Sequence, residues 1–243
     1  MNHALIIGGS KGLGKETVDA YSRAGWSVSS ISRGEQSFPP ATSVTPWKAD
    51  ISKQTDVQNI IPSIISSSGN PKAVIVCQRF RSEQEDWDGE LQSSITGVKY
   101  VMDALCEIPT FNDSSVVFVS SVNAKLISRQ VSLSYHVAKA ALNQMIRYYA
   151  VKLGARGIRI NSVSPGTFVK PSTKEAYQNN SELGELMREV IPLGRLCEAS
   201  EVISTIMFLT SPASSFITAQ DIVIDGGVGA LYPEALAREL FSL

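Results

Sequence analysis

Two side chains in the middle of the sequence, Tyr135 and Lys139, could exchange a proton with a substrate. They stand four residues apart, and this spacing places side chains on the same face of a helix. An ammonium group beside a phenol favours the ionised phenolate, so that the phenol can give or take a proton nearer neutral pH. Such a pair could act as a general acid in the reduction of a carbonyl group. Tyr and Lys also occur at this spacing on helix surfaces without any role, so the neighbouring motifs decide its meaning.

Ser120 and Ser121 supply hydroxyl groups at the end of an apolar run. A hydroxyl that donates a hydrogen bond to the substrate oxygen would complete the site, because donors aimed at developing negative charge stabilise the transition state. A serine that only caps the end of its strand is the alternative.

A glycine-rich turn follows the first apolar run of the chain, Ala4–Ile7, and precedes a segment with helical periodicity. Such a turn lets backbone amides and the helix N-terminus approach a pyrophosphate without interference from a Cβ atom. Tight packing of the turn is the alternative interpretation. The turn residues that we expect to contact a dinucleotide are Gly8, Ser10, Lys11, Gly12, Leu13 and Gly14.

Short runs rich in β-branched residues alternate with longer helical segments along the chain. The predicted strands are Ala4–Ile7, Ser27–Ile31, Val44–Trp47, Ala73–Val76, Val116–Val119, Ile158–Val163 and Ile222–Ile224. The predicted helices are Glu16–Arg23, Thr55–Ile65, Leu91–Leu105, Tyr135–Leu153 and Glu201–Leu209. Continuous apolar strands between helices are typical of a doubly wound parallel sheet that is buried on both faces. We therefore expect an α/β fold, a single Rossmann domain over residues 1–243 with about seven strands.

A polar segment within 168–190 interrupts this rhythm before the last strand. Ligands of open α/β sheets bind outside the carboxyl ends of the strands, so a segment that leaves this edge could close over a substrate. A surface segment that does not contact the substrate is the alternative.

Several motifs, in this order, resemble those of the short-chain dehydrogenase/reductase family. The glycine turn has that family's G-x-x-x-G-x-G spacing, and Tyr135 and Lys139 match its Tyr-x-x-x-Lys helix. Residues 161–166 (Asn-Ser-Val-Ser-Pro-Gly) are similar to its nicotinamide-side loop, and residues 192–195 and 225–227 resemble its C-terminal signature. The resemblance covers nearly the whole chain and implies a nicotinamide-dependent oxidoreductase.

The resemblance also implies which residues contact the cofactor. Asp50 and Ile51 would hold the adenine, and Lys139 would bind the hydroxyl groups of the nicotinamide ribose. The remaining implied contacts are Cys77, after the fourth strand, and the loop residues Pro165, Gly166, Thr167 and Phe168.

Besides Ile7 and Lys170, three positions depart from the family pattern. The position that corresponds to the family's serine, counted back from the tyrosine, is Val122, and Ser121 lies one residue further away. We therefore infer a one-residue insertion in the loop and assign the catalytic hydroxyl to Ser121, with Ser120 as the less favoured candidate. The run Asn-Asn-Ala-Gly after the fourth strand is replaced by Cys77–Phe80, which leaves the tethering of that strand open.

The third departure concerns a helix asparagine, which falls on Ser94. In the family its backbone carbonyl holds a water that connects the lysine to solvent. A backbone carbonyl exists whatever the side chain is, so we expect Ser94 to serve the same proton relay if the helix opens there. We also expect the serine hydroxyl to bond a neighbouring helix carbonyl and so encourage the bend.

The end of the second strand indicates which dinucleotide binds. NAD-binding turns usually carry an acidic residue there, which accepts a hydrogen bond from the ribose 2′-hydroxyl. This chain has Ser32 and Arg33 instead, and Lys11 supplies a second positive charge. Arginine suits the geometry of a phosphate, so NADPH is the expected cofactor, although both cations could simply be solvated.

Composition limits the classes of partner. The chain has 22 basic and 23 acidic side chains without a basic run, which argues against nucleic acid or an anionic membrane. Three scattered cysteines argue against a disulfide framework and against a metal site. No signal-like or membrane-spanning segment is evident, so we expect a cytoplasmic protein. The family resemblance implies a homo-oligomer, a dimer or a tetramer, and we expect the tetramer.

Two functions are compatible with these patterns. The first is the reduction of a ketone or aldehyde of a small metabolite to an alcohol, or the reverse, with Tyr135 as acid and base. The second is a nucleotide-binding or assembly protein that has kept the fold while its catalysis is weak or lost. The retention of Tyr135, Lys139 and a nearby serine favours the first.

Overall fold

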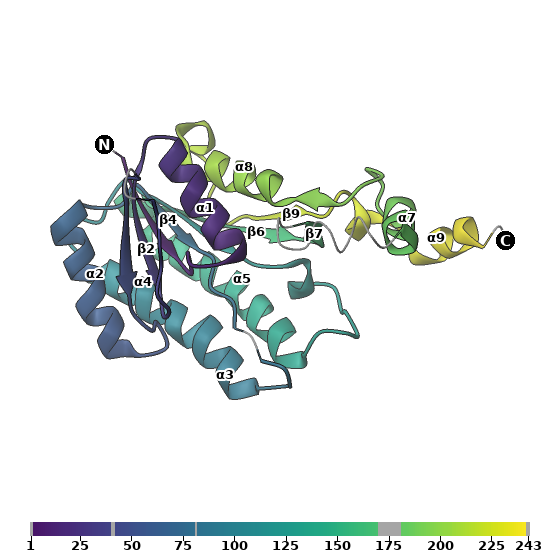
Figure 1. Ribbon diagram of the computed structural model, residues 1–243, viewed down its shortest axis with the longest axis horizontal. Helices are drawn as coiled ribbons and strands as arrows, with labels where there is room; N and C mark the ends of the chain where they lie inside the picture. The colour runs from purple at the N-terminus through teal and green to yellow at the C-terminus, as the bar shows by residue number, and fades with distance from the viewer. Residues whose placement is uncertain (1, 40–41, 81, 170–180, 242–243) are drawn as a thin grey trace.

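A parallel seven-stranded sheet forms the centre of the computed structural model, which describes residues 2–39, 42–80, 82–169 and 181–241 (Figure 1). The strand order is β3-β2-β1-β4-β5-β6-β9, and each neighbouring pair is parallel. The strands are β1 (His3–Ile7), β2 (Ser27–Ser32), β3 (Val44–Lys48), β4 (Ala73–Val76), β5 (Ser115–Val119), β6 (Arg159–Pro165) and β9 (Asp221–Ile224). The expected doubly wound α/β fold is confirmed, and each of the seven predicted strands is present.

Helices cover both faces of the sheet because successive strand residues point to opposite sides. Leu5 and Ile7 of β1 pack with α2 (Gln54–Ser68), α4 (Gly97–Glu107) and α5 (Leu133–Leu153). Ala4 and Ile6 pack on the other face with α1 (Gly12–Arg23) and α8 (Ala199–Thr210). All four of these β1 side chains are buried, and burial of a side chain as large as Leu or Ile contributes about 1.5–3 kcal/mol.

The predicted helix Leu91–Leu105 is interrupted in the structure. It comprises α3 (Trp87–Leu91), one widened π-helical turn, η1 (Gln92–Thr96), and then α4. At the junction Gly97 packs closely on the turn that follows β3, where an added Cβ atom would lie 2.9 Å from the Ile51 carbonyl oxygen. The widened turn contains Ser94, so the condition on which the expected relay at this residue depended is met.

The remaining elements extend the carboxyl-terminal half. The short strands β7 (Phe168–Val169) and β8 (Cys197–Glu198) pair with each other, and α7 (Ser181–Val190) and α9 (Pro233–Leu240) lie at the end of the molecule away from β3 (Figure 1). Within the expected lid at 168–190, residues 170–180 lie outside the described part of the chain. The 3₁₀ turns are η2 (Val122–Ala124), η3 (Gly154–Arg156), η5 (Pro212–Ser214) and η6 (Val228–Ala230).

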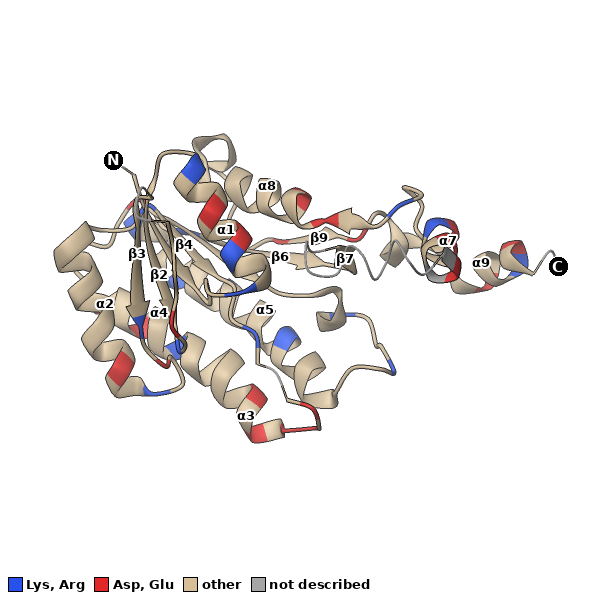
Figure 2. Ribbon diagram, viewed as in Figure 1, with Lys and Arg blue, Asp and Glu red and all other residues tan. Residues whose placement is uncertain are grey.

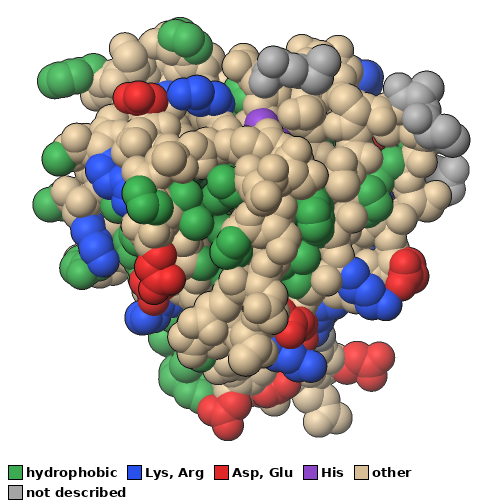
Figure 3. All heavy atoms as spheres, turned by 90° about the vertical axis from the view of Figure 1, so that its left-hand side faces the viewer, with side chains coloured by type: hydrophobic (Ala, Val, Ile, Leu, Met, Phe, Trp, Pro, Cys, Tyr) green, Lys and Arg blue, Asp and Glu red, His purple; other side chains and the backbone are tan. Residues whose placement is uncertain are grey.

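The surface on the β3 side shows hydrophobic side chains scattered among charges of both signs (Figure 3). This face offers no patch of one sign that would attract a polyanion. In the described ranges, no helix combines the length and the apolar character needed to cross a bilayer. The same residues contain no cluster of three or more His, Cys, Asp or Glu side chains that could hold a metal ion.

A carboxylate at the first residue of β9, Asp221, joins four elements. Its Oδ1 atom accepts hydrogen bonds from Ser162 Oγ at 2.9 Å and Ser164 Oγ at 2.6 Å, both on β6. Its Oδ2 atom accepts from Asn143 Nδ2 on α5 at 3.0 Å and pairs with Lys125 Nζ at 3.0 Å. Because Lys125 directly follows η2, this network fixes the loop between β5 and α5 against the sheet.

We expect Asp221→Ala to lower the free energy of unfolding by about 2–4 kcal/mol, because buried donors on β6 and α5 lose their acceptor. The matched control is Asp19→Ala, which removes an exposed carboxylate paired with Lys15 and should change stability by less than about 0.5 kcal/mol. Urea unfolding monitored by circular dichroism measures both. Equal losses from the two variants would contradict the structural role of Asp221.

Candidate active site

A cleft of about 340 Å³ opens where β1, β4, β5 and β6 end, and it contains most of the predicted site residues. These are Lys11, Gly12, Leu13, Gly14, Cys77, Ser120, Ser121, Tyr135, Lys139, Pro165, Gly166, Thr167 and Phe168. The topology brings them together because the carboxyl ends of parallel strands meet at one edge of the sheet. Gln78, Arg79 and Val119 complete the lining.

The glycine turn forms one wall of the cleft and has little space for side chains. Gly8 and Gly12 adopt positive φ angles of +85° and +54°, which favour glycine. A Cβ atom on Gly14 would lie 2.1 Å from the Gly8 carbonyl oxygen, so α1 can approach the sheet this closely only with glycine there. The N-cap residue Lys11 makes no side-chain cap, which leaves the first amide groups of α1 available to an anion. This wall fits the pyrophosphate of a dinucleotide.

Tyr135 and Lys139 lie on the opposite wall, on α5. This helix begins after Ser132, whose Oγ atom accepts a hydrogen bond from the Tyr135 amide at 3.3 Å. The Lys139 side chain is buried, and its Nζ atom donates to the Val119 carbonyl at 2.9 Å and lies 5.5 Å from the centroid of the Tyr135 ring. The spacing prediction that placed the two groups side by side is therefore matched by the geometry.

Burial lowers the pKa of Lys139 to about 8, because the charged ammonium loses its water. The Glu90 carboxylate opposes this shift and the Arg79 guanidinium adds to it. The ammonium is therefore charged at neutral pH and loses its proton as the pH rises through about 8.

The two serines differ in their hydrogen bonds. Ser121 Oγ accepts a hydrogen bond from the Asn123 amide at 3.2 Å, which orients the hydroxyl and leaves its hydrogen to be donated. Ser120 Oγ is buried without a hydrogen-bond partner in the described residues. Ser121 is thus the better oriented donor, and the same hydrogen bond caps the 3₁₀ turn η2.

The segment that replaces Asn-Asn-Ala-Gly is tethered to the helix opposite it. Gln78 Nε2 donates to Ser93 Oγ at 2.9 Å. The Phe80 ring occupies the space left by Gly89, where an added Cβ atom would lie 2.5 Å from Phe80 Cζ. Side-chain contacts across to α3 and η1 therefore tether the end of β4.

The other two residues of this segment face the cleft. The Arg79 guanidinium lies 5.9 Å from the centroid of the Tyr135 ring. Loss of water around the sulfur raises the pKa of the Cys77 thiol to about 12, so it is neutral at physiological pH and does not repel a phosphate.

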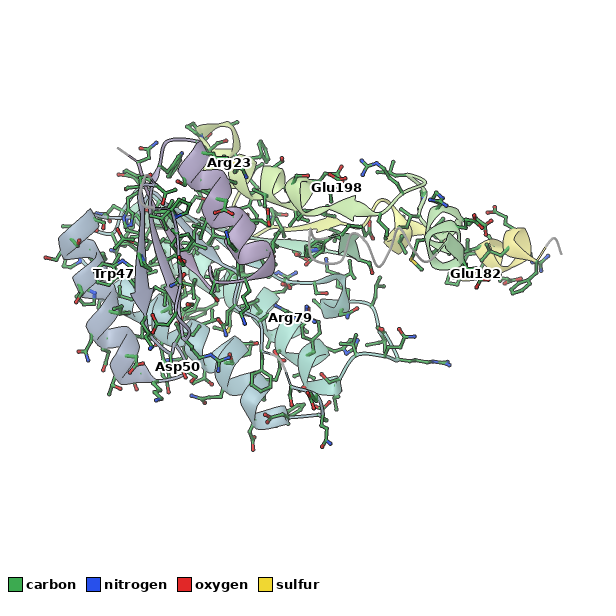
Figure 4. The ribbon with its side chains drawn as sticks, viewed as in Figure 1. Arg23, Trp47, Asp50, Arg79, Glu182 and Glu198 are labelled. Atoms are coloured by element: carbon green, nitrogen blue, oxygen red, sulfur yellow. The ribbon has the colours of Figure 1, made fainter. Side chains whose placement is uncertain are left out.

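Several predicted cofactor residues do not line this cleft. Gly8 packs beneath it, on the Cys77 backbone, and Ser10 lines an adjoining polar cavity of about 1190 Å³. Arg33 is exposed at the end of β2, next to the buried Ser32, and Ile51 is buried in the core. Asp50 Oδ1 accepts hydrogen bonds from Ser52, and Asp50 lies toward α2 whereas Arg79 lies beside α5 (Figure 4).

Ser94 is buried behind the cleft and its hydroxyl does not bond a helix carbonyl. That expectation was wrong, because Ser94 Oγ donates to Glu90 Oε1 at 2.5 Å, one helical turn earlier. None of the sequence motifs described above includes Glu90. The available signal was a carboxylate four residues before Ser94, on the same face of the helix.

An apolar cavity of about 220 Å³ adjoins the cleft at Gly166 and Thr167. Val122, Leu126, Met187, Val190, Ile191, Leu193 and Ile224 contribute its apolar side chains. The helix α7 therefore meets the loop after β5 around this space.

Comparisons with known proteins agree with this fold and cleft. A family model described as enoyl-(acyl carrier protein) reductase matches residues 8–229. The chain is 30% identical over 243 residues to a tropinone reductase homolog of Arabidopsis thaliana, with 92% of each chain covered. It is 28% identical over 244 residues to a 3-oxoacyl-[acyl-carrier-protein] reductase of Thermotoga maritima, with 92% of this chain and 96% of that protein covered.

A solved structure with similar architecture is that of a short-chain dehydrogenase family protein from Francisella tularensis. It has a TM-score of 0.81 and 27% identity, and the match covers 95% of this chain and all of that chain. The chain belongs to the short-chain dehydrogenase/reductase family. It is an NAD(P)-dependent oxidoreductase acting on carbonyl and alcohol groups, and the relatives do not favour the alternative of a protein without catalysis.

Proposed function

We propose that the protein reduces a ketone or aldehyde of a small metabolite to an alcohol, or catalyses the reverse reaction, with Tyr135 as acid and base. The observation that carries this proposal is that Tyr135, Lys139 and Ser121 share one cleft with the glycine turn. A nicotinamide cofactor supplies or accepts the hydride when it is bound. In the reduction, the Tyr135 hydroxyl donates its proton to the carbonyl oxygen as negative charge develops there.

Lys139 and Ser121 assist this proton transfer. The ammonium of Lys139 stabilises the phenolate that remains after Tyr135 has given up its proton. The Ser121 hydroxyl donates a hydrogen bond to the same substrate oxygen, so that the developing charge has a fixed donor at the transition state. Lys139 also binds the hydroxyl groups of the nicotinamide ribose.

The remaining site residues are proposed to hold the cofactor. The glycine turn binds the pyrophosphate, Asp50 and Ile51 hold the adenine, and Ser32 and Arg33 meet the adenosine ribose. The full set is Gly8, Ser10, Lys11, Gly12, Leu13, Gly14, Ser32, Arg33, Asp50, Ile51, Cys77, Tyr135, Lys139, Pro165, Gly166, Thr167 and Phe168.

NADPH is the proposed form of the cofactor. Arg33 is exposed at the end of β2, and Lys11 lies at the start of α1, so that both cations can reach a 2′-phosphate. The nearest following carboxylate, Glu35, is engaged by Lys48, with 2.6 Å between Lys48 Nζ and Glu35 Oε1. That ion pair lowers the pKa of Glu35 and directs its carboxylate to β3. The carboxylate is then turned away from the ribose 2′-hydroxyl that it would bind in NADH, which supports binding of the 2′-phosphate of NADPH.

The substrate is proposed to enter beside α7. Met187 and Val190 of this helix line the apolar cavity that adjoins the cleft, which supports a covering role for segment 168–190. Relatives named as a tropinone reductase homolog and a 3-oxoacyl reductase support a ketone substrate.

A homotetramer in the cytoplasm is the proposed working form. On α5, the side chains of Val151 and Tyr148 are 83% and 60% exposed, and such apolar groups on a helix face favour contact with another subunit. Light scattering at micromolar concentration should give four times the mass of the chain. A dimer mass would agree with a subunit contact on α5 but would contradict the tetramer. A monomer mass would contradict both the contact and the tetramer.

We expect Tyr135→Phe to abolish turnover while the NADPH dissociation constant stays within about threefold, because the ring still packs and only the proton donor is lost. Lys139→Ala should impair both turnover and cofactor affinity. The measurements are NADPH oxidation with a panel of ketones and aldehydes, and NADPH binding by fluorescence. Wild-type-like turnover in Tyr135→Phe would remove Tyr135 from the mechanism.

The charge of Arg33 should matter for one dinucleotide only. We expect Arg33→Ala to weaken NADPH binding by about tenfold or more and to change NADH binding by less than about twofold, because only the 2′-phosphate contacts that charge. Titration of both dinucleotides into wild type and variant decides this. Arg23→Ala, an exposed cation at the end of α1, is the matched control. Equal losses for NADH and NADPH would assign Arg33 a structural role instead.

A further inference from the structure

Glu90 is a buried carboxylate that the proposed mechanism does not yet use. It lies on α3, with 4% of its surface exposed, and Ser94 Oγ donates to its Oε1 atom at 2.5 Å. Ser94 is itself 3% exposed. Burial of a carboxylate is costly unless hydrogen bonds or an opposite charge compensate the lost hydration. One hydrogen bond from a serine compensates only part of this cost, which points to an additional partner of positive charge.

The position of α3 supplies that partner. This helix packs against α5, which carries Tyr135 and Lys139. Glu90 and Tyr135 line the same polar cavity of about 1190 Å³, and the charges of Glu90 and Lys139 interact. Lys139 Nζ donates its hydrogen bond to the Val119 carbonyl, and Glu90 influences the ammonium by its charge.

The charges around Lys139 come from three directions. Arg79, after β4, lies 5.9 Å from the Tyr135 ring and repels the ammonium. The Cys77 thiol at the end of β4 is neutral near physiological pH. On α5 itself, the nearest titratable neighbour is the Tyr135 phenol. Among the described groups that face Lys139, Glu90 is therefore the negative charge that offsets both burial and Arg79.

We propose that Glu90, held in place by Ser94, is the positioning residue that keeps Lys139 in its charged form during turnover. The proposal rests on the assignment of Tyr135 and Lys139 as the catalytic pair. Ser94 provides a clamp for the carboxylate here, in addition to any backbone contact with water at the widened turn η1. A neutral side chain at position 90 would leave the buried ammonium beside Arg79 without compensation, and Lys139 would then lose its proton at lower pH.

The decisive variant is Glu90→Gln, which keeps the shape of the side chain and removes its charge. In wild type, activity should decline with rising pH as Lys139 loses its proton near pH 8. In Glu90→Gln this decline should occur at lower pH, with activity reduced by about fivefold or more at pH 8 and by less than about twofold at pH 6. A purely structural role would lower activity by the same factor at every pH.

Two controls separate charge from packing. Asp88→Asn removes an exposed carboxylate from the same helix, in the acidic region at the start of α3 (Figure 2), where water screens it. Its pH profile should match that of wild type. Ser94→Ala keeps the Glu90 charge and should lower turnover by less than about tenfold. The decline of its activity at high pH should shift less than in Glu90→Gln.

A second readout does not depend on turnover. Because Lys139 is proposed to bind the nicotinamide ribose, NADPH affinity should also fall as Lys139 deprotonates, and it should fall at lower pH in Glu90→Gln. If Glu90→Gln does not fold, Glu90→Met replaces it, since an apolar side chain of similar size tolerates burial without a partner. In Glu90→Met, the pH profiles of activity and of NADPH affinity should both shift to lower pH, as expected for Glu90→Gln.

The outcomes distinguish this proposal from the proposed function. If both profiles of the charge-removing variant overlay those of wild type while Tyr135→Phe is inactive, Glu90 has no influence on Lys139 and the oxidoreductase mechanism stands. If wild type oxidises NADPH with none of the carbonyl compounds, the proposed reaction fails. The pH dependence of NADPH binding then still supports or overturns the influence of Glu90 on Lys139.

Discussion

Burial of the parallel sheet on both faces is the constraint on which this structure depends. Parallel neighbours require a crossover connection that returns the chain to the starting end of the sheet, and most of these crossovers contain a helix that covers one face. All seven strands of the sheet therefore end on the same side. The glycine turn after β1 and Cys77 after β4 become neighbours because Ile7 pairs with Val76, although the two segments are far apart in sequence. The cleft is a consequence of this arrangement, and it is lined by the residues just beyond the strands together with Tyr135 and Lys139 on α5.

A buried ammonium imposes the second constraint. Lys139 loses most of its hydration, and the Val119 carbonyl and the Glu90 carboxylate compensate this loss only in part, while Arg79 works against them. The balance brings the pKa of Lys139 to about 8, close enough to physiological pH for its charge to respond to single neighbours. The charge of Lys139 therefore depends on residues from other elements of the fold.

Two of the departures from the family pattern, the end of β4 and Ser94, are separate in the sequence but converge on α3 and η1 in the structure. Gln78 and Phe80 contact Ser93 and Gly89, and Ser94 bonds Glu90. All of these partners lie on α3 or η1, so the altered end of β4 and the altered helix form one contact region. This explains how the end of β4 can remain fixed without the asparagines that usually tether it.

Local patterns in the sequence were sufficient to predict the fold, the glycine turn and the pairing of Tyr135 with Lys139. The hydrophobic periodicity of strands and helices, the residue types of turns and the four-residue spacing on a helix all depend on residues that are close in sequence. The sequence did not reveal that the predicted helix Leu91–Leu105 contains a widened turn, or that the Ser94 hydroxyl would find a carboxylate in place of a helix carbonyl. Tertiary structure alone decided that α3 packs against α5 and brings the charge of Glu90 within the influence of the buried Lys139. That charge interaction joins two helices that are separate in the sequence, and its effect arises from shared burial, which spacing along one helix cannot indicate.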